Sequence, residues 1–265
     1  MASGSLVALD VDGTLTIGRH PPSRAVRLAV REAVERGDHV VLATGRSLRS
    51  VSRVIADLGL SQGYVVCSNG AVVVDLKTGL PVEVQRFAAG PVVEAVDRVL
   101  PGALFAVEVI GVGHQVSDEF PLGVLTGELT VAPLEKMIAE PVCRLTAWWP
   151  SRSPAQVVDQ LGATRLPGAD GSFDVGRPWM VAFAAGVSKR AALERLRVRL
   201  GVGAEATLAV GDGDNDIEML RWAAHGVAMG QAPPLVRAAA DAVTGTIMED
   251  GLASALVAWS ETRLF

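Results

Sequence analysis

Two aspartates near the start of the chain are separated by one residue, a spacing that is typical of a catalytic carboxylate pair. Asp10 and Asp12 follow the apolar run Leu6–Leu9, which is typical of a buried strand, and Gly13-Thr14 then indicates a turn. Two carboxylates this close raise each other's pKa, so a positive partner is expected beside them. A hard divalent cation such as Mg²⁺ fits, because it prefers carboxylate, carbonyl and water oxygens. The pair therefore predicts a catalytic, metal-assisted site.

A second acidic segment far downstream has the same organisation. The β-prone run Thr207–Val210 is followed by Asp212, Asp214, Asn215 and Asp216, with two glycines among them. A helical pattern begins directly afterwards, so Asn215 or Asp216 is expected to cap that helix. Capping accounts for one of these residues but not for three carboxylates. The segment therefore predicts a second part of the same site.

The elements that position these acids alternate between strand and helix patterns. In the first third of the chain, strands are predicted over 6–9, 39–43 and 64–67, and helices over 23–36 and 50–58. This succession implies parallel pairing with right-handed crossovers, which brings the carboxyl ends of the strands to one edge. Asp10, Thr44 and Asn69 each follow a strand, so we expect them to meet there.

Residues 84–184 have a different pattern. Pro and Gly interrupt this segment, and few of its connections are long enough for parallel crossovers, which favours an antiparallel sheet with helices on one face. We therefore predict an α/β fold, with a Rossmann-like parallel sheet core over 1–83 and 185–265 and an inserted α+β cap domain over 84–184. Trp148, Trp149 and Trp179 are expected to pack the sheet of the insert, and His114 to lie at the surface.

Composition narrows the class of protein. The 265 residues are 49% hydrophobic and carry a formal net charge of −5, without basic runs, which argues against a nucleic-acid partner. Two cysteines without a CxxC pattern and four scattered histidines give no zinc-ligand spacing. The apolar runs are far shorter than the roughly 20 residues that span a membrane. The N-terminal residues show no basic segment followed by a long apolar stretch, so a cytoplasmic location is expected.

Four segments resemble, in order, the four motifs of the haloacid-dehalogenase-like (HAD) phosphatases: Asp10–Thr14, Ala43–Arg46, Gly186–Lys189 and Gly211–Asp216. Ser68–Ala71 and Gly226–Gly230 resemble the Cof-type branch of that superfamily, which carries a large type IIB α+β cap between the second and third motifs. The chain departs from the branch at two positions. Gln231 stands where Asn is common, and Arg190 stands where Gly is common.

The resemblance implies a role for each matching residue. Asp10 would be the nucleophile that forms an aspartyl-phosphate, and Asp12 the general acid and base. The ligands of a Mg²⁺ ion would be Asp10, Asp212 and the backbone carbonyl of Asp12. Asp216 would orient the metal-bound waters or the lysine of the third motif. The phosphoryl group would be bound by the residues Thr44, Gly45, Lys189 and Asn215.

The function implied by the resemblance is that of a phosphoric monoester hydrolase. It would be a Mg²⁺-dependent phosphatase that hydrolyses small phosphate monoesters, such as sugar phosphates or similar metabolites, as a monomer or homodimer. Two alternatives remain open: a phosphosugar mutase of the phosphomannomutase kind, and a non-enzymatic aspartyl-phosphate receiver module. Release of inorganic phosphate separates the phosphatase from the mutase, and the lifetime of the phosphorylated protein separates it from the receiver.

Overall fold

A computed structural model describes residues 4–121, 123–174 and 176–262. The chain divides into two compact units, the first made of the residues up to Arg46, Val51–Glu83 and the residues from Ser188 onward, the second of Ser47–Ser50 and Val84–Val187. The final segment of the first unit thus begins at Ser188, where the sequence placed its start at residue 185. Residues 1–3 and 263–265 of the expected core domain lie outside the described residues.

The first unit is built on a sheet in which eight strands are described. Their order across the sheet is β14 (Ala242–Val243), β13 (His225–Ala228), β12 (Thr207–Gly211), β1 (Leu6–Leu9), β2 (His39–Ala43), β3 (Tyr64–Cys67), β4 (Val72–Asp75) and β5 (Pro81–Val84). The pairings from β14 to β3 are all parallel, which confirms the predicted Rossmann-like core. β4 pairs antiparallel with β3, so the sheet continues past the predicted strands.

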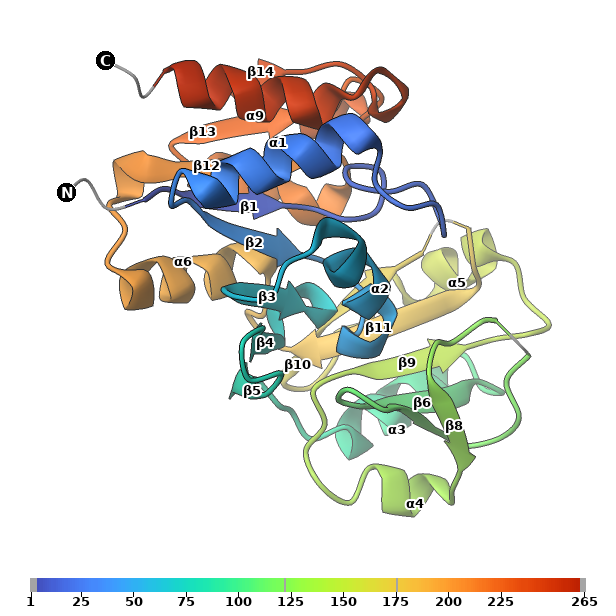
Figure 1. Cartoon of the computed structure of the whole chain (residues 1–265). Coiled ribbons are helices and arrows are strands. Elements are labelled where there is room, and N and C mark those ends of the chain that lie inside the picture. The colour runs from blue at the N-terminus through green and yellow to red at the C-terminus, as the bar shows by residue number, and fades with distance from the viewer. Residues whose placement is uncertain (1–3, 122, 175, 263–265) are drawn as a thin grey trace. The chain divides into compact units, whose positions relative to one another are not determined.

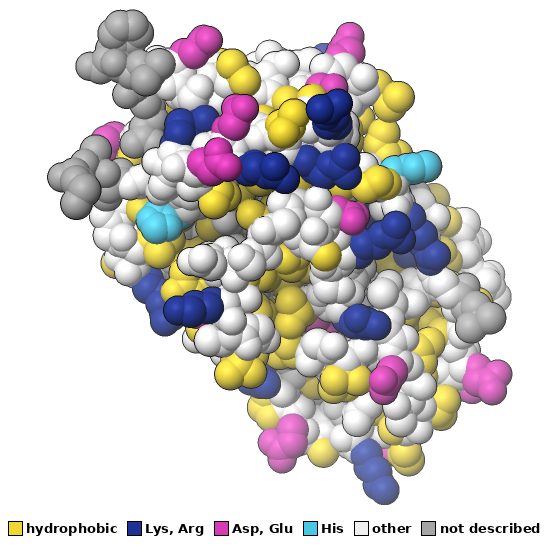
Figure 2. Space-filling view, viewed as in Figure 1, with side chains coloured by type: hydrophobic (Ala, Val, Ile, Leu, Met, Phe, Trp, Pro, Cys, Tyr) yellow, Lys and Arg dark blue, Asp and Glu magenta, His cyan; other side chains and the backbone are white. Residues whose placement is uncertain are grey.

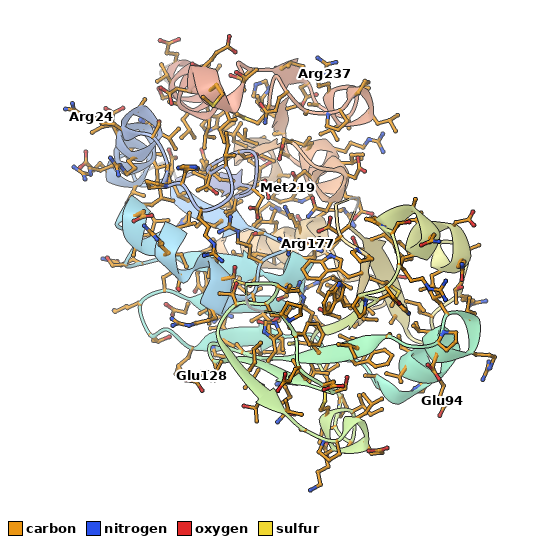
Figure 3. All side chains as sticks on the ribbon, turned by 90° about the vertical axis from the view of Figure 1, so that its right-hand side faces the viewer. Arg24, Glu94, Glu128, Arg177, Met219 and Arg237 are labelled. Carbon is orange, nitrogen blue, oxygen red and sulfur yellow. The ribbon has the colours of Figure 1, made fainter. Side chains whose placement is uncertain are left out.

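Helices cover both faces of this sheet. They are α1 (Arg24–Glu35), α2 (Leu48–Leu58), α6 (Lys189–Leu200), α7 (Ile217–Trp222), α8 (Pro234–Arg237) and α9 (Gly251–Glu261), with short 3-10 turns η1 (Ser68–Gly70), η2 (Ala204–Ala206), η3 (Asp214–Asp216) and η4 (Ile247–Glu249). Figure 1 shows α1 and α9 side by side on one face. Leu6 and Ala8 share a buried cluster with Leu193 of α6 and Met219 of α7. Figure 3 labels Met219.

Two helices of the first unit begin at serine caps. The side chain of Ser23 accepts the backbone N–H of Val26 in α1, and Ser188 accepts that of Ala191 in α6. α6 ends at Gly201, whose φ of +67° is a left-handed conformation that glycine adopts readily. The Ser188 cap thus fixes Lys189 as the first residue of α6.

The second unit has a six-stranded sheet within the described residues. Its order is β10 (Ala169–Phe173), β11 (Trp179–Ala184), β9 (Leu145–Trp148), β6 (Leu104–Val109), β7 (Gly113–Val116) and β8 (Glu128–Val131), and its helices are α3 (Gly90–Val99), α4 (Leu134–Met137) and α5 (Pro154–Leu161). The pairings are antiparallel as predicted except for β7 with β8, which run parallel.

The aromatic residues of the second unit pack its interior. Trp149 is fully enclosed and donates its indole N–H to the carbonyl of Leu100 at 2.9 Å. The expectation for His114 was wrong, because this residue lies on β7, a strand the sequence did not predict, and is only 4% exposed. Burial, and then the charge of Arg144, lower the pKa of His114 to about 4.

The surface of the first unit carries charges of both signs. On the face drawn in Figure 2, basic side chains lie across the first unit with acidic side chains beside them. Within the described ranges, none of the helices combines the length and the apolar composition needed to cross a membrane.

Candidate active site

Three neighbouring parallel strands of the first unit end in polar residues. Asp10 follows β1, Thr44 follows β2, and Asp212 follows β12. Because β1 lies between β2 and β12, these residues meet at one edge of the sheet. The backbone N–H of Asp10 donates to the carbonyl of Val210 at 3.0 Å, which ties the first acidic segment to the second.

A buried lysine joins two of the carboxylates. The Nζ atom of Lys189 donates to Oδ1 of Asp10 at 2.6 Å and to Oδ1 of Asp216 at 2.7 Å, and all three side chains are shielded from solvent. Lys189 reaches them because the start of α6 lies close against η1. A Cβ atom on Gly70, which has a φ of +105°, would overlap the backbone of Ser188, so only glycine permits this approach.

Asp216 organises the acidic loop. Its Oδ2 atom accepts the backbone N–H groups of Asp212 at 3.0 Å and Gly213 at 2.9 Å. The sequence suggested that Asn215 or Asp216 caps the following helix, but Asp216 makes no side-chain cap bond to α7. Its carboxylate instead folds the turn that carries Asp212 and accepts from Lys189 at the same time.

Three carboxylates converge with one lysine between them. Asp10, Asp212 and Asp216 each offer an oxygen, and these oxygens all lie within 4.8 Å of one another. Burial, then the charge of Asp216, raise the pKa of Asp10 to about 8 against the lowering effect of Lys189. The same two causes raise the pKa of Asp212 to about 6. Burial lowers the pKa of Lys189, but the two carboxylates outweigh burial and raise it overall, so Lys189 stays charged.

The composition of this cluster fits a hard divalent cation. Its donors are all oxygens, no imidazole or thiolate belongs to it among the described residues, and its negative charge exceeds what one lysine neutralises. Asp10 and Asp212 are the two side chains best placed to hold such an ion, because both oxygens of Asp216 already accept hydrogen bonds from Lys189 and the backbone.

Arg46 is a site residue that the sequence did not single out. Its guanidinium donates to both carboxylate oxygens of Asp12, at 2.9 Å from Nε and 2.6 Å from Nη2. Nη2 also donates to the carbonyl of Gly18 at 3.0 Å. The Asp12 side chain therefore points to Arg46, outside the cluster of three carboxylates.

Small polar groups complete the edge of the sheet. The buried hydroxyl of Thr44 accepts the backbone N–H of Arg46 at 3.0 Å. Asn215 donates its amide to the side chain of Asn69 at 2.9 Å, which joins two loops that are 146 residues apart. A Cβ atom on Gly45 would lie 3.1 Å from the amide oxygen of Asn69, so Gly45 borders the same polar group. Every residue that the sequence proposed for the site thus belongs to the first unit.

Comparison with known proteins identifies the family. The family described as haloacid dehalogenase-like hydrolase matches residues 7–100 and 171–256. The chain therefore belongs to the haloacid dehalogenase-like hydrolases, and it is an enzyme of the Cof-type branch that the sequence motifs indicated.

Two curated relatives span almost the whole chain. A 5-amino-6-(5-phospho-D-ribitylamino)uracil phosphatase of Bacillus subtilis is 28% identical over 96% of this chain and 95% of its own length. A phosphoglycolate phosphatase of Natronomonas pharaonis is 30% identical over 94% of this chain and 95% of its own.

Solved structures share the architecture. A phosphatase of the HAD superfamily from Bacteroides thetaiotaomicron is 26% identical with a TM-score of 0.79, covering 97% of this chain and 96% of that one. A sugar phosphatase of HAD subclass IIB has the same fold, with a TM-score of 0.79 at 23% identity over 97% of this chain and 99% of that one.

Proposed function

We propose that this chain is a Mg²⁺-dependent phosphatase that hydrolyses small phosphate monoesters through an aspartyl-phosphate on Asp10. The observation that carries the proposal is the cluster of Asp10, Asp212 and Asp216, in which Lys189 pairs with the buried Asp10 and Asp216 and Asp212 is half-buried. One lysine does not neutralise three carboxylates, so the cluster can take up a divalent cation, beside which a phosphoryl group would bind. A bound Mg²⁺ ion shields the charges of carboxylate and phosphate from each other.

In the first half of the reaction, a carboxylate oxygen of Asp10 attacks phosphorus and the bond from phosphorus to the ester oxygen breaks. Asp12 gives a proton to the departing alkoxide, for which its pair with Arg46 must open, because both of its carboxylate oxygens accept hydrogen bonds from that guanidinium. Lys189 and the hydroxyl of Thr44 stabilise the phosphoryl oxygens as a point charge and a hydrogen-bond donor.

In the second half, water attacks the phosphorus of the aspartyl-phosphate. The ionised Asp12 takes the proton of that water, and inorganic phosphate leaves while the carboxylate of Asp10 is restored. Asp216 acts as a positioning residue, since its contacts fix both Lys189 and the turn that carries Asp212.

The substrate class is proposed from chemistry and from the relatives. Both curated relatives described above are named for small organic phosphate esters, a phosphorylated ribitylaminouracil and phosphoglycolate. We therefore propose a small phosphorylated metabolite, such as a sugar phosphate, as the substrate. The inserted segment 84–184 is proposed to select its organic half, and replacing that segment with a short linker tests this assignment through the preference among esters.

The test is a panel of phosphate esters assayed for inorganic phosphate with Mg²⁺ and after exhaustive chelation. We expect steady release that requires the metal and is lost in Asp10→Asn. Full activity after chelation would refute the metal requirement. Transfer of the phosphoryl group to a second sugar hydroxyl without phosphate release would favour the mutase, and a phosphorylated protein stable for hours would favour the receiver module.

A further inference from the structure

Gln231 occupies one of the two positions at which the sequence departs from the Cof-type pattern, and it lies beside the carboxylate cluster. Its Nε2 atom donates to the carbonyl of Gly13 at 2.6 Å and lies 3.4 Å from Oδ2 of Asp212. Its Oε1 atom accepts the backbone N–H of Ile247 at 3.1 Å. One exposed side chain therefore joins three loops that are far apart in the sequence.

The neighbours of Gln231 fix the direction of its amide. The carbonyl of Gly13 can only accept a hydrogen bond, and the backbone N–H of Ile247 can only donate one. Satisfying both requires an NH₂ group on one side and an oxygen on the other, which is what a carboxamide supplies. A carboxylate could not donate to Gly13, and an apolar side chain could serve neither partner.

The two groups that Gln231 contacts at the site are in direct contact with each other. Gly13 has a φ of +84°, and a Cβ atom placed on it would overlap the carboxylate of Asp212. The loop that follows Asp10 and the loop that carries Asp212 therefore lie against each other without a side chain between them. These two loops begin next to the candidate metal ligands: one follows Asp10, and the other carries Asp212.

We propose that Gln231 is a positioning residue of the metal site, which holds the Gly13 loop and Asp212 at the separation that cation binding requires. Ile247 anchors the amide oxygen, so that the amide NH₂ stays directed at Gly13 and Asp212. This inference rests on the proposed function, because it concerns the metal that the phosphatase would use. Partners that orient metal ligands typically change metal affinity by about 10–100-fold when they are removed.

The test is calorimetric titration of the purified protein with Mg²⁺ in the absence of substrate. Gln231→Met keeps an unbranched side chain of similar length but has no donor or acceptor of this kind. We expect it to weaken Mg²⁺ binding by about 10-fold or more. The matched control is Gln62→Met, the same exchange at an exposed loop position of the same unit, which should bind Mg²⁺ like the wild type.

A second variant removes the hydrogen bond to the oxygen of the same amide group and leaves the Gln231 side chain unchanged. Ile247→Pro removes the backbone N–H that anchors Oε1. Ile247 is the first residue of η4, where proline is tolerated, and Thr246 before it has φ −71° and ψ 166°, a conformation that a following proline favours. We expect weaker Mg²⁺ binding with the Gln231 side chain still present.

The outcomes separate this inference from the proposed function. Wild-type affinity in Gln231→Met, or a lowered melting temperature of the metal-free protein with unchanged Mg²⁺ affinity, would overturn the positioning role alone. Phosphate release by the wild type would then continue to support the phosphatase. Failure of the wild type to bind Mg²⁺ at millimolar concentration would overturn the inference and the metal part of the proposed function together.

Discussion

Replacing Asp216 with asparagine tests the buried charge cluster with almost no change of shape. The carboxylate of Asp216 accepts one hydrogen bond from Lys189 and two from the backbone N–H groups of Asp212 and Gly213. An asparagine has only one accepting oxygen. If that oxygen serves the backbone, the NH₂ group faces the Lys189 ammonium, and if it serves Lys189, the two backbone donors lose their acceptor. Asp216→Asn therefore breaks the network in either orientation.

The size of the effect follows from burial. Removing one partner of a buried ion pair costs about 3–5 kcal/mol, because the remaining charge stays out of water without compensation. Lys189 still contacts Asp10 at 2.6 Å, so the lower end, about 3 kcal/mol, applies. In a protein of this size each kcal/mol corresponds to about 2–4 °C, which predicts a melting temperature lower by about 6–12 °C.

Urea unfolding of the metal-free protein measures this difference. The control is Asp214→Asn, which makes the same change of charge two residues away on an exposed side chain of the same turn. Asp214→Asn should remain within about 0.5 kcal/mol of the wild type, as surface substitutions usually do. If Asp216→Asn is no less stable than Asp214→Asn, repulsion among the three carboxylates outweighs the contacts with Lys189 and the backbone, and the reasoning is wrong.

Three further predictions concern single residues of the site. Asp10→Asn should leave less than about 1% of kcat in the phosphate-release assay, because loss of a nucleophile costs many powers of ten, and larger residual activity would contradict its role. In the metal-free protein, the raised pKa of Asp10 means that the folded state holds a proton more tightly than the unfolded state. The free energy of unfolding should therefore fall between about pH 4 and pH 8, by at most about 1.4 kcal/mol per pH unit from this group, and Asp10→Asn should reduce that slope in urea titrations at several pH values. Arg46→Ala should cost less than about 1 kcal/mol in the same unfolding assay, since the side chain of its partner Asp12 is 56% exposed, and a loss of 3 kcal/mol would show that the pair is structurally essential.

The parallel core could be predicted because its signals are local. Apolar runs of four or five residues alternate with helix patterns, of which the first begins at the serine cap Ser23 and the first two are followed by Gly37 and Gly59. Chirality then fixes the crossovers. The continuation of the sheet through β4 and β5 carries no such signal. No helix separates Val72–Asp75 or Pro81–Val84 from the strand before it, so β4 joins the sheet by antiparallel pairing with β3 and β5 lies beside β4. The strand that buries His114 was missed for the same reason.

Some residues of the site could likewise be predicted from local sequence signals, and others could not. Asp10, Thr44 and Asp212 could be placed at one edge because each follows a parallel strand, and the carboxyl ends of parallel strands meet at the same edge of a sheet. Arg46 and Gln231 could not be placed, because their partners are set by tertiary packing: Arg46 pairs with Asp12 across 34 residues and Gln231 with Gly13 across 218. The only signal for Gln231 was its departure from the Cof-type pattern.

The order of strands in the core sheet also determines when each strand can pair with its neighbour during synthesis. Leu6 of the central strand β1 pairs with Thr207 of β12, so one edge of β1 has no partner until the ribosome has made roughly 200 further residues. At about 5–20 residues per second this takes about 10–40 s, during which the half-built sheet presents an edge of unpaired backbone N–H and C=O groups. Most of the second unit is one continuous stretch, Val84–Val187, and emerges within that interval. Slow translation between residues 84 and 206 would therefore lengthen the period in which the nascent chain depends on chaperones.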